Sequence, residues 1–343
     1  NQLLCMLFGQ LSSRESLRDL ITVIEAHQSK SYHLGFGKNV TRSNLSKANE
    51  NRNYKIFEDF ANHLILIAQE KNSNDSFEIK GNIYAFDSST IDLCLSVFWW
   101  AHFRKTKAGI KLHTLFDVNT QIPVFIHITE ANIHDVHSMD IINYEPFAYY
   151  IFDRGYFDYL RLYRITKASA YFVVRAKSNL KFKRMYSKKT DKSTGVIYDQ
   201  TGKIDGFYTS KDYPEKIRKV KFLDIENKKT LIFLTNNFDL SAQQIALLYK
   251  QRWQIELFFK WIKQHLKVKT FWGTTENAVR IQINTAIITY CLVSIIAKDL
   301  KINRSIYEIL QILSASLLDK TPINELLMKS DYNNVNELDS NQL

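Results

Sequence analysis

The chain has 343 residues, of which 45% are hydrophobic, so it can bury a sizeable core, and its composition excludes a disordered or collagen-like protein. Its 46 basic and 35 acidic residues leave a net charge of +11, which indicates a polyanionic partner without separating nucleic acid from a membrane surface. The three cysteines are far apart and lack the spacing of a disulfide framework or a zinc site, which favours a reducing, cytoplasmic compartment.

The N-terminal 80 residues predict a helical module. Amphipathic patterns predict helices over residues 12–28, 41–50 and 54–69, followed by a polar linker at 70–80. Ser12 and Glu15 have the spacing of a capping box for the first helix. Arg42 and Lys47 make the middle helix basic, as in a helix-turn-helix motif, so both are candidate DNA-binding residues; a plain helical subdomain is the alternative. Because the chain begins in a helix-like segment, we expect this module to lack its start.

From residue 82 the hydrophobic pattern changes to that of strands alternating with helices. We expect strands at 82–87, 109–118, 122–129, 148–153, 170–175, 219–225 and 230–235, and helices at 135–143, 157–167, 241–269, 276–299 and 305–317. The longest apolar run, 283–297, is shorter than the roughly 20 residues that span a bilayer, which predicts a buried core helix and no membrane partner.

Two predicted strands each end in an aspartate. Phe86-Asp87 closes the strand at 82–87, and Phe152-Asp153 closes the strand at 148–153. Functional sites in α/β sheets form at the carboxyl ends of strands, although a single aspartate there is more often a helix cap or turn residue. Two such aspartates after apolar runs favour a site.

The predicted long helix supplies a third acid, Glu256. At 100° per residue, Tyr249, Arg252, Glu256 and Lys263 lie within about 60° of one another on this helix. An intrahelical salt bridge explains the Arg252–Glu256 pair and is worth only a few tenths of a kcal/mol. It does not explain the whole set of four residues.

Most of the positive charge lies in one segment. Residues 175–229 contain sixteen Lys or Arg and seven Asp or Glu, a net +9, interleaved with aromatic residues. Such a pattern suits a surface that contacts phosphates and stacks bases, and Arg175 and Lys177 at its start are candidate DNA-binding residues. A solvated basic hairpin region is the alternative.

These residues carry a resemblance to a known family. Tyr249-x2-Arg252-x3-Glu256-x6-Lys263 resembles the YREK signature of the DDE transposases of bacterial insertion sequences, insertion-sequence family four. Asp87-Ser88-Ser89 and Asp153-Arg154-Gly155-Tyr156-Phe157 resemble the two aspartate motifs of that family. The segments 107–113 and 132–135 are also similar, and the resemblance covers about residues 1–325.

The resemblance implies an α/β fold, an RNase H-like catalytic core with a mixed sheet flanked by helices, interrupted by a β-rich insertion and preceded by an α-helical DNA-binding module. The implied domains are a helical N-terminal module at 1–80, the core at 81–175 and 231–320, a basic β-rich insertion at 176–230 and a polar tail at 321–343. The 103 positions between Asp153 and Glu256 exceed a single strand–helix connection, which requires such an insertion.

The resemblance further implies a transposase with three catalytic carboxylates, Asp87, Asp153 and Glu256, that hold two Mg²⁺ ions, with Mn²⁺ as a possible substitute. Asp87 would bridge both ions, and Asp153 and Glu256 would each complete one. Clustered carboxylates without Cys or His suit Mg²⁺ better than zinc. Tyr249, Arg252 and Lys263 would bind phosphates beside the scissile bond.

The implied partners are double-stranded DNA, both as the element's terminal inverted repeats and as target, and a second copy of the chain in a homodimer on DNA. The implied location is the bacterial cytoplasm, in association with the nucleoid. Some members form a DNA hairpin with the help of a Trp in the insertion. This chain has no Trp between Asp153 and Arg252, so Tyr198, Phe207 or Tyr208 would have to serve.

Two other functions remain open from the residues alone. One is a catalytically inactive or repurposed sequence-specific DNA-binding protein, and the other is an RNase H-like nuclease without strand transfer. A metal site made of His113, His127, His134 and His137 is a further alternative, against which we interpret these residues as hydrogen-bonded strand and turn residues.

Overall fold

The computed structural model describes residues 1–37, 40–73, 79–104, 107–225, 228–265 and 271–328. Its internal contacts divide the chain into two units. Residues 1–71 with 265–343 form the first, which we call the helical unit, and residues 72–264 form the second, which we call the sheet unit.

The helical unit contains helices from both ends of the chain. They are α1 (Gln2–Leu11), α2 (Leu17–Ala26), α3 (Gln28–His33), α4 (Arg42–Asn51), α5 (Lys55–Asn72), α10 (Glu276–Asp299), α11 (Ile306–Ser316) and α12 (Ile323–Leu327). The predicted cap of α2 is wrong: Ser16, not Ser12, caps this helix and accepts a hydrogen bond from the Asp19 N–H, while the Ser12 hydroxyl donates to the Phe8 carbonyl at the end of α1. Thr41 caps α4 by the same kind of bond to the Asn44 N–H.

Helix α10 forms the core of the helical unit. It contacts α1, α4 and α11. By length and composition α10 is long and apolar enough to cross a membrane, but 78% of its most apolar window is buried inside the protein. The predicted buried core helix is therefore confirmed, with the bounds expected at 276–299.

This packing divides the chain at positions other than the domain boundaries that the resemblance implied. The predicted core extended to residue 320, whereas the structure groups α10 and α11 with the N-terminal helices. The apolar faces of α1 and α10 are buried against each other, which hydropathy along the chain cannot reveal. Within the predicted polar tail the structure forms α12, and residues 329–343 lie outside the described residues.

The sheet unit is built on one mixed sheet of ten strands. The strands are β1 (Ile83–Leu93), β2 (His102–Arg104), β3 (Lys107–Asp117), β4 (Ile122–Glu130), β5 (Tyr149–Phe152), β6 (Tyr171–Arg175), β7 (Phe182–Lys188), β8 (Val196–Ile204), β9 (Ile217–Asp224) and β10 (Lys229–Thr235). Their order is β2-β3-β1-β5-β6-β10-β9-β8-β7, with β4 also paired to β3. Strands β1, β5 and β6 are parallel to one another, and the remaining pairs are antiparallel.

Helices cover both faces of this sheet. They are α6 (Tyr159–Lys167), α7 (Thr209–Asp212), α8 (Ala242–Gln251) and α9 (Trp253–His265), together with short 3₁₀ helices at Asp135–Ile141, Arg154–Tyr156 and Lys192–Thr194. Phe86, Phe152 and Val174 face the side on which Leu162 and Ile165 of α6 are buried. On the other side the Phe233 ring contacts Tyr249 of α8 at 4.7 Å and the Phe116 ring contacts Phe258 of α9 at 5.2 Å between ring centroids.

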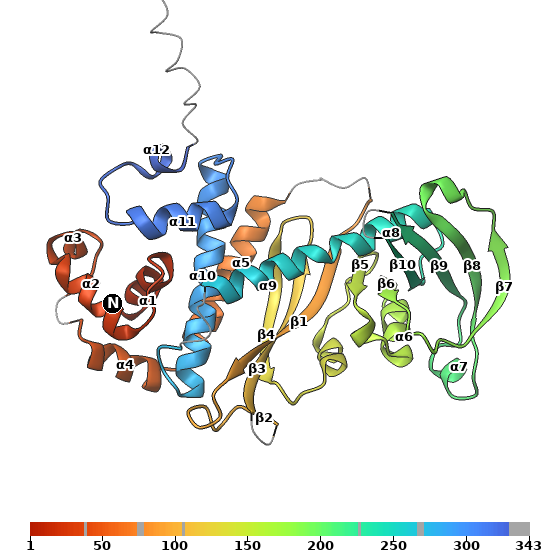
Figure 1. Cartoon of the computed structure of the whole chain (residues 1–343), viewed down its shortest axis with the longest axis horizontal. Helices are drawn as coiled ribbons and strands as arrows, with labels where there is room; N and C mark the ends of the chain where they lie inside the picture. Colours follow the sequence, from red (N-terminus) through yellow and green to blue (C-terminus); the bar gives the residue numbers. More distant parts are fainter. Residues whose placement is uncertain (38–39, 74–78, 105–106, 226–227, 266–270, 329–343) are drawn as a thin grey trace, which may run out of the picture. The chain divides into compact units, whose positions relative to one another are not determined.

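The basic segment 176–230 forms β7, β8, β9 and the first residues of β10. Its strands continue the same sheet, because β10 pairs with β6, and Figure 1 shows β7 to β10 side by side. The β-rich character expected for this segment is therefore present. It forms one edge of the ten-stranded sheet.

Three expected elements have different bounds. The strand predicted to stop at Asp87 continues to Leu93, and the helix expected at 135–143 is a 3₁₀ helix. The single helix expected at 241–269 is two helices that meet at Arg252, where N–H groups bond to carbonyls three residues back; Figure 1 shows α8 and α9 following one another in almost the same direction. Residues 266–269 of that expected helix lie outside the described residues.

Candidate active site

Asp87 and Asp153 lie on neighbouring strands at the same level of the sheet. The parallel pairing of β1 with β5 ends at Phe86 opposite Phe152, so Asp87 and Asp153 are the next residues on the two strands. Adjacent strands lie about 4.8 Å apart and successive side chains alternate between faces. Since Phe86 and Phe152 face α6, both aspartates point to the opposite face, which α8 and α9 cover.

The junction of α8 and α9 brings the third acid to these two. The Arg252 guanidinium donates from Nη1 to Asp87 Oδ2 at 2.9 Å and from Nη2 to Glu256 Oε1 at 2.5 Å. The Tyr249 hydroxyl donates to Asp153 Oδ1 at 3.1 Å. The structure thus brings together five of the predicted site residues from β1, the end of β5, α8 and α9.

The cluster is partly shielded from water. Side-chain exposures are 20% for Asp87, 15% for Arg252 and 34% for Glu256. Burial raises the pKa of Asp87 to about 6; the Ser88 N–H and Arg252 oppose this rise, and the charges of Asp153 and Glu256 add to it. Burial and the nearby Asp153 charge raise the pKa of Tyr249 to about 12, which keeps its hydroxyl protonated as a donor. The group therefore concentrates negative charge that Arg252 only partly balances.

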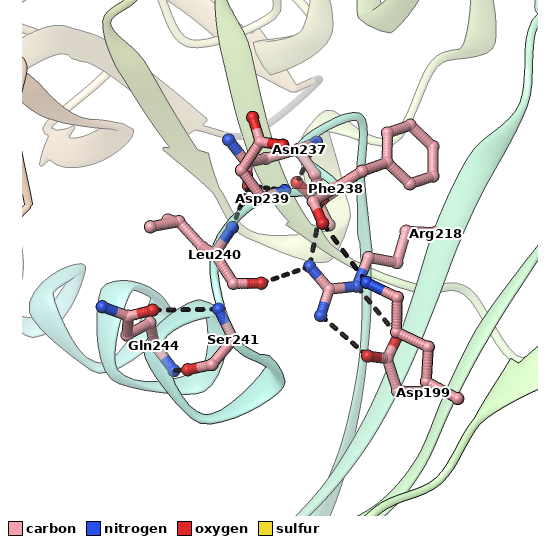
Figure 2. Close-up of polar contacts among 10 residues, drawn as sticks. Asp199, Arg218, Asn237, Phe238, Asp239, Leu240, Ser241 and Gln244 are labelled. Atoms are coloured by element: carbon pink, nitrogen blue, oxygen red, sulfur yellow. Dashed lines mark hydrogen bonds and ion pairs between the residues drawn. The ribbon is translucent and has the colours of Figure 1, made fainter.

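A buried ion pair fixes the loop from which α8 begins. Arg218 of β9 binds both carboxylate oxygens of Asp199 on β8 at 2.8 Å, and both side chains are almost fully buried. As Figure 2 shows, Arg218 Nη1 also donates to the carbonyls of Asn237 and Leu240, at 3.2 and 2.6 Å. Ser241 and Gln244 then form the capping box that starts α8. Arg218 therefore links the basic strands to the helix that carries Tyr249.

Three further residues next to the site, Ser88, Lys111 and Asp135, were missed as functional candidates. Ser88, on the opposite face of β1 from Asp87, donates to Asp135 at 2.7 Å, and Lys111 of β3 forms an ion pair with Asp135 at 3.0 Å. Together they attach the 3₁₀ helix at Asp135–Ile141 to β1 and β3. Lys111 and Asp135 lie in the segments 107–113 and 132–135, and the similarity of these segments to the family could have identified both residues.

Three predicted DNA-binding residues of the sheet unit lie apart from these contacts. Lys263 is exposed on α9, seven residues beyond Glu256. Arg175 ends β6 opposite Phe233 of β10. Lys177 is exposed and donates to the Phe157 carbonyl at 3.0 Å. Arg42 and Lys47 are exposed on α4 in the helical unit.

Aromatic side chains of the basic strands divide into two groups. Phe182 and Tyr198 are covered by Lys219, whose ammonium lies 4.3 and 5.3 Å from their ring centroids. Phe207 and Tyr208 are 71% and 77% exposed before α7. Of the three rings expected to serve for base capture, Phe207 and Tyr208 are therefore the more exposed, although the Lys211 ammonium lies 4.2 Å from the Phe207 ring centroid.

Two of the four histidines, His113 and His137, form hydrogen bonds of the kind expected for strand and turn residues. His113 is buried, and its Nε2 lies 2.9 Å from the Thr129 hydroxyl. His137 Nδ1 lies 3.2 Å from Arg161 Nη2. Burial lowers the pKa of His113 to about 4, so its imidazole is neutral at pH 7.

The three carboxylates fit a hard divalent cation by donor chemistry, since such ions prefer carboxylate oxygens. Within the described residues, no three His, Cys, Asp or Glu side chains are arranged as a ready metal site. Arg252 lies instead between Asp87 and Glu256 and supplies the positive charge. Its two ion pairs are the contacts that a bound cation would have to replace.

The mixed sheet flanked by helices, with acids on β1, after β5 and on α9, is the arrangement of an RNase H-like core. Residues 78–292 match the family described as "Transposase DDE domain". The chain belongs to this family of DDE transposases and is an enzyme that acts on DNA by transposition. Membership of the family implies dependence on a divalent metal.

Named relatives agree with this family. The chain is 34% identical over 283 residues to "Putative transposase y4zB" of Sinorhizobium fredii, covering 81% of this chain and 78% of the relative. It is 31% identical to "Probable transposase for insertion sequence element IS5377" of Geobacillus stearothermophilus, over 67% of this chain and 60% of the relative. It is 26% identical to "Putative transposase for insertion sequence element IS4SA" of Synechocystis, over 83% of this chain and 80% of the relative.

The N-terminal segment has a separate match. Residues 1–37, which contain α1, α2 and α3, match a family described as a domain of unknown function. This match assigns no function to α1, α2 and α3.

Proposed function

We propose that the sheet unit cuts and joins DNA strands at Asp87, Asp153 and Glu256, in a transposase of insertion-sequence family four. The observation that carries this proposal is the meeting of three carboxylates around Arg252 and Tyr249 in a family that acts on DNA. Two Mg²⁺ ions, or Mn²⁺ in their place, would be held there and would activate the attacking oxygen and stabilise the leaving one.

The reaction would be two in-line displacements. In cleavage, a water oxygen bonds to phosphorus as the bond to the 3′-oxygen breaks, which leaves a 3′-hydroxyl and a 5′-phosphate. In joining, that 3′-oxygen bonds to a target phosphorus and displaces the 3′-oxygen there. Asp87, Asp153 and Glu256 would together hold the ions.

The neighbouring side chains would hold the acids and the DNA. The Tyr249 hydroxyl holds one oxygen of Asp153 in place and leaves the other free. The forked Arg252 guanidinium, which pairs with Asp87 and Glu256, would bind a phosphate in bidentate fashion. Lys263, exposed on α9, would add a second phosphate contact.

The rest of the chain would bring DNA ends to this site. We assign the element's terminal inverted repeats to the helical unit, through Arg42 and Lys47, and flanking or target DNA to the basic strands with Arg175 and Lys177. Two ends have to be joined together, so the active form would be a homodimer on DNA, located with the bacterial nucleoid. Capture of a flipped base by Phe207 or Tyr208 would support a hairpin step, because both rings are exposed.

A strand-cleavage and strand-transfer assay with the full chain, the element's own ends and Mg²⁺ tests the proposal. We expect cleaved and joined products with the wild type and none with Asp153→Asn. The matched control is Asp140→Asn, which removes an acid from the surface ion pairs with Arg161 and Arg164 and should leave the products unchanged. Cleavage without joining would indicate a nuclease, and DNA binding without cleavage would indicate a repurposed DNA-binding protein.

A further inference from the structure

The helical unit contains a cavity of about 680 Å³ between the start of α2 and the exposed face of α4. Its wall includes Ser16, Arg18, Arg42, Ser46, Lys47 and Trp272. All of these residues belong to the helical unit, whereas Asp87, Asp153 and Glu256 belong to the sheet unit.

The lining of this cavity is rich in hydrogen-bond donors and positive charge. Arg18, Arg42 and Lys47 are exposed at its edge, and no acidic side chain lines it within the described residues. Two acids, Glu15 and Asp19, are adjacent in sequence to the lining residues, and neither lines the cavity; the Asp19 carboxylate accepts from the Glu15 N–H at 3.1 Å and pairs with Arg14 at 3.4 Å. Three cations without a neutralising acid favour an anionic ligand.

Helix α2 adds backbone donors to the same wall. Ser16 caps the helix through the Asp19 N–H, which leaves the N–H groups of Leu17 and Arg18 without an intrahelical acceptor. Leu17 and Arg18 both line the cavity. The first turn of a ten-residue helix carries partial positive charge and binds phosphate groups readily.

Trp272 gives an independent observation. It is only 9% exposed, and its indole N–H has no hydrogen-bond acceptor within the described part of the chain. The ring is held against Gly9, where an added Cβ would lie 2.3 Å from the indole. Burying an unpaired donor is costly. Trp272 lines the cavity, and this unsatisfied donor is buried in the wall behind it rather than exposed to the cavity.

We propose that this cavity binds a phosphodiester group of the DNA backbone. The inference rests on the proposed DNA-binding role of the helical unit and deepens it by naming the group that is bound and the residues that bind it. Arg42 and Lys47 would pair with the phosphate oxygens, and the first turn of α2 and the hydroxyls of Ser16 and Ser46 would complete the contacts. The cavity is open and much larger than one phosphate, which suits a group that remains part of a strand.

The test uses the indole N–H resonance of Trp272 as a reporter in the full chain. The protein has five tryptophans, and Trp272→Phe identifies which of the five indole signals belongs to Trp272. A short mixed-sequence DNA duplex should shift this signal to saturation. Inorganic phosphate at matched ionic strength should shift it in the same direction but more weakly.

Two double variants separate the cavity from general charge. Arg42→Gln/Lys47→Gln should abolish the Trp272 shift, weaken duplex binding at least roughly tenfold and lower the salt slope of binding by about 1 per cation removed. Lys55→Gln/Lys320→Gln removes the same charge from exposed positions of the same unit that do not line the cavity, and should leave the shift in place. These variants keep the test valid if Trp272→Phe does not fold.

The following outcomes would overturn the assignment of this cavity or the proposed DNA-binding role of the helical unit. If the duplex binds tightly while the Trp272 signal stays fixed, or if the shift survives Arg42→Gln/Lys47→Gln, the cavity is not the phosphate site and only this inference fails. If inorganic phosphate shifts the signal and the duplex does not, the cavity binds small anions and its assignment to DNA is overturned. If the wild type binds no DNA, the proposed DNA-binding role fails as well.

Discussion

At the scale of single residues, Arg252 connects two acids of the candidate site and supplies the positive charge between them. It bonds to Asp87, whose register places it beside Asp153, and to Glu256 one helical turn further on. All three ionised side chains are at most about one third exposed. Without the guanidinium, two carboxylates would face each other across a poorly solvated space.

The first prediction is that Arg252→Gln lowers the free energy of unfolding by about 1–3 kcal/mol in buffer with a chelator, because it leaves buried carboxylates unpaired. Arg252→Lys should be intermediate, since an ammonium does not bridge two acids as a fork does. Urea unfolding followed by circular dichroism measures this. The control Arg164→Gln removes a surface ion pair and should cost less than about 1 kcal/mol. Equal stability of Arg252→Gln and wild type would contradict the bridging role.

A second prediction concerns His113, whose pKa is lowered to about 4 by burial. The unfolded chain binds a proton near pH 6.5, whereas the folded chain does not until about pH 4. This contribution to stability is thus complete above pH 6.5 and is lost as the pH falls towards 4, by up to about 1.4 kcal/mol per pH unit.

Unfolding titrations between pH 7 and 4 compare wild type with His113→Gln, which should lack this part of the acid-induced loss. His63→Gln, at an exposed position of α5, should behave as wild type does. A His113→Gln curve parallel to that of the wild type would mean that His113 does not carry the dependence.

The site residues were predictable to different degrees. The two strand-associated aspartates and the Tyr249, Arg252 and Glu256 spacing indicated a site, and the structure brings all five together. The sequence did not show that β1 continues past Asp87, because the apolar run ends at that residue and the extension depends on antiparallel pairing with β3. It also gave no sign that the helix is interrupted at Arg252.

At the scale of the elements, the start of α8 depends on a contact between distant parts of the basic segment. The buried Asp199–Arg218 pair joins β8 to β9, and Arg218 reaches the carbonyls of the loop before Ser241. Among sixteen cations in that segment, sequence patterning could not distinguish one buried arginine from the exposed ones. Such a pairing depends on strand register, which here places Thr201 opposite Arg218.

The third prediction follows from this pair. Arg218→Met leaves the Asp199 carboxylate buried and unpaired and should cost about 3–5 kcal/mol in free energy of unfolding. Asp199→Leu/Arg218→Met should recover part of that loss, which a double-mutant cycle measures. Lys216→Met, at an exposed position just before β9, is the control and should change stability little. A small effect of Arg218→Met would show that the pair does not anchor α8.

Strands β7 and β8 place two like charges opposite each other. Lys183 lies directly opposite Lys203, and both are exposed. Like charges opposite each other destabilise a sheet by a fraction of a kcal/mol. A DNA backbone along these strands would neutralise both.

The fourth prediction is therefore that removing these two charges stabilises the fold and weakens DNA binding. Lys183→Gln/Lys203→Gln should raise the free energy of unfolding by a few tenths of a kcal/mol and weaken duplex binding, with a salt slope lower by about 2. Thermal unfolding and fluorescence anisotropy at several salt concentrations measure the two effects. Unchanged DNA affinity would exclude this pair of strands from the DNA surface.

At the scale of the whole molecule, the structure shows where the positive charge lies and which helices pack together. Most of the net charge of +11 lies in the strands that extend the catalytic sheet, and a further group of cations lines the cavity of the helical unit. The α/β, RNase H-like class was implied by the family resemblance, whereas most elements followed from hydrophobic periodicity. The grouping of α10 with the N-terminal helices did not, because it depends on which apolar faces meet, and many pairings satisfy the same periodicity.

The fifth prediction and most direct test of the account is strand cleavage by Glu256→Gln in the full chain. Gln keeps the size of the side chain and a hydrogen-bond acceptor for Arg252 but removes the charge that a divalent cation needs. With the element's ends and Mg²⁺, we expect no detectable nicking or joining by Glu256→Gln and DNA affinity within about twofold of the wild type. Mg²⁺-dependent nicking retained by this variant would contradict the assignment of Asp87, Asp153 and Glu256 as the catalytic site.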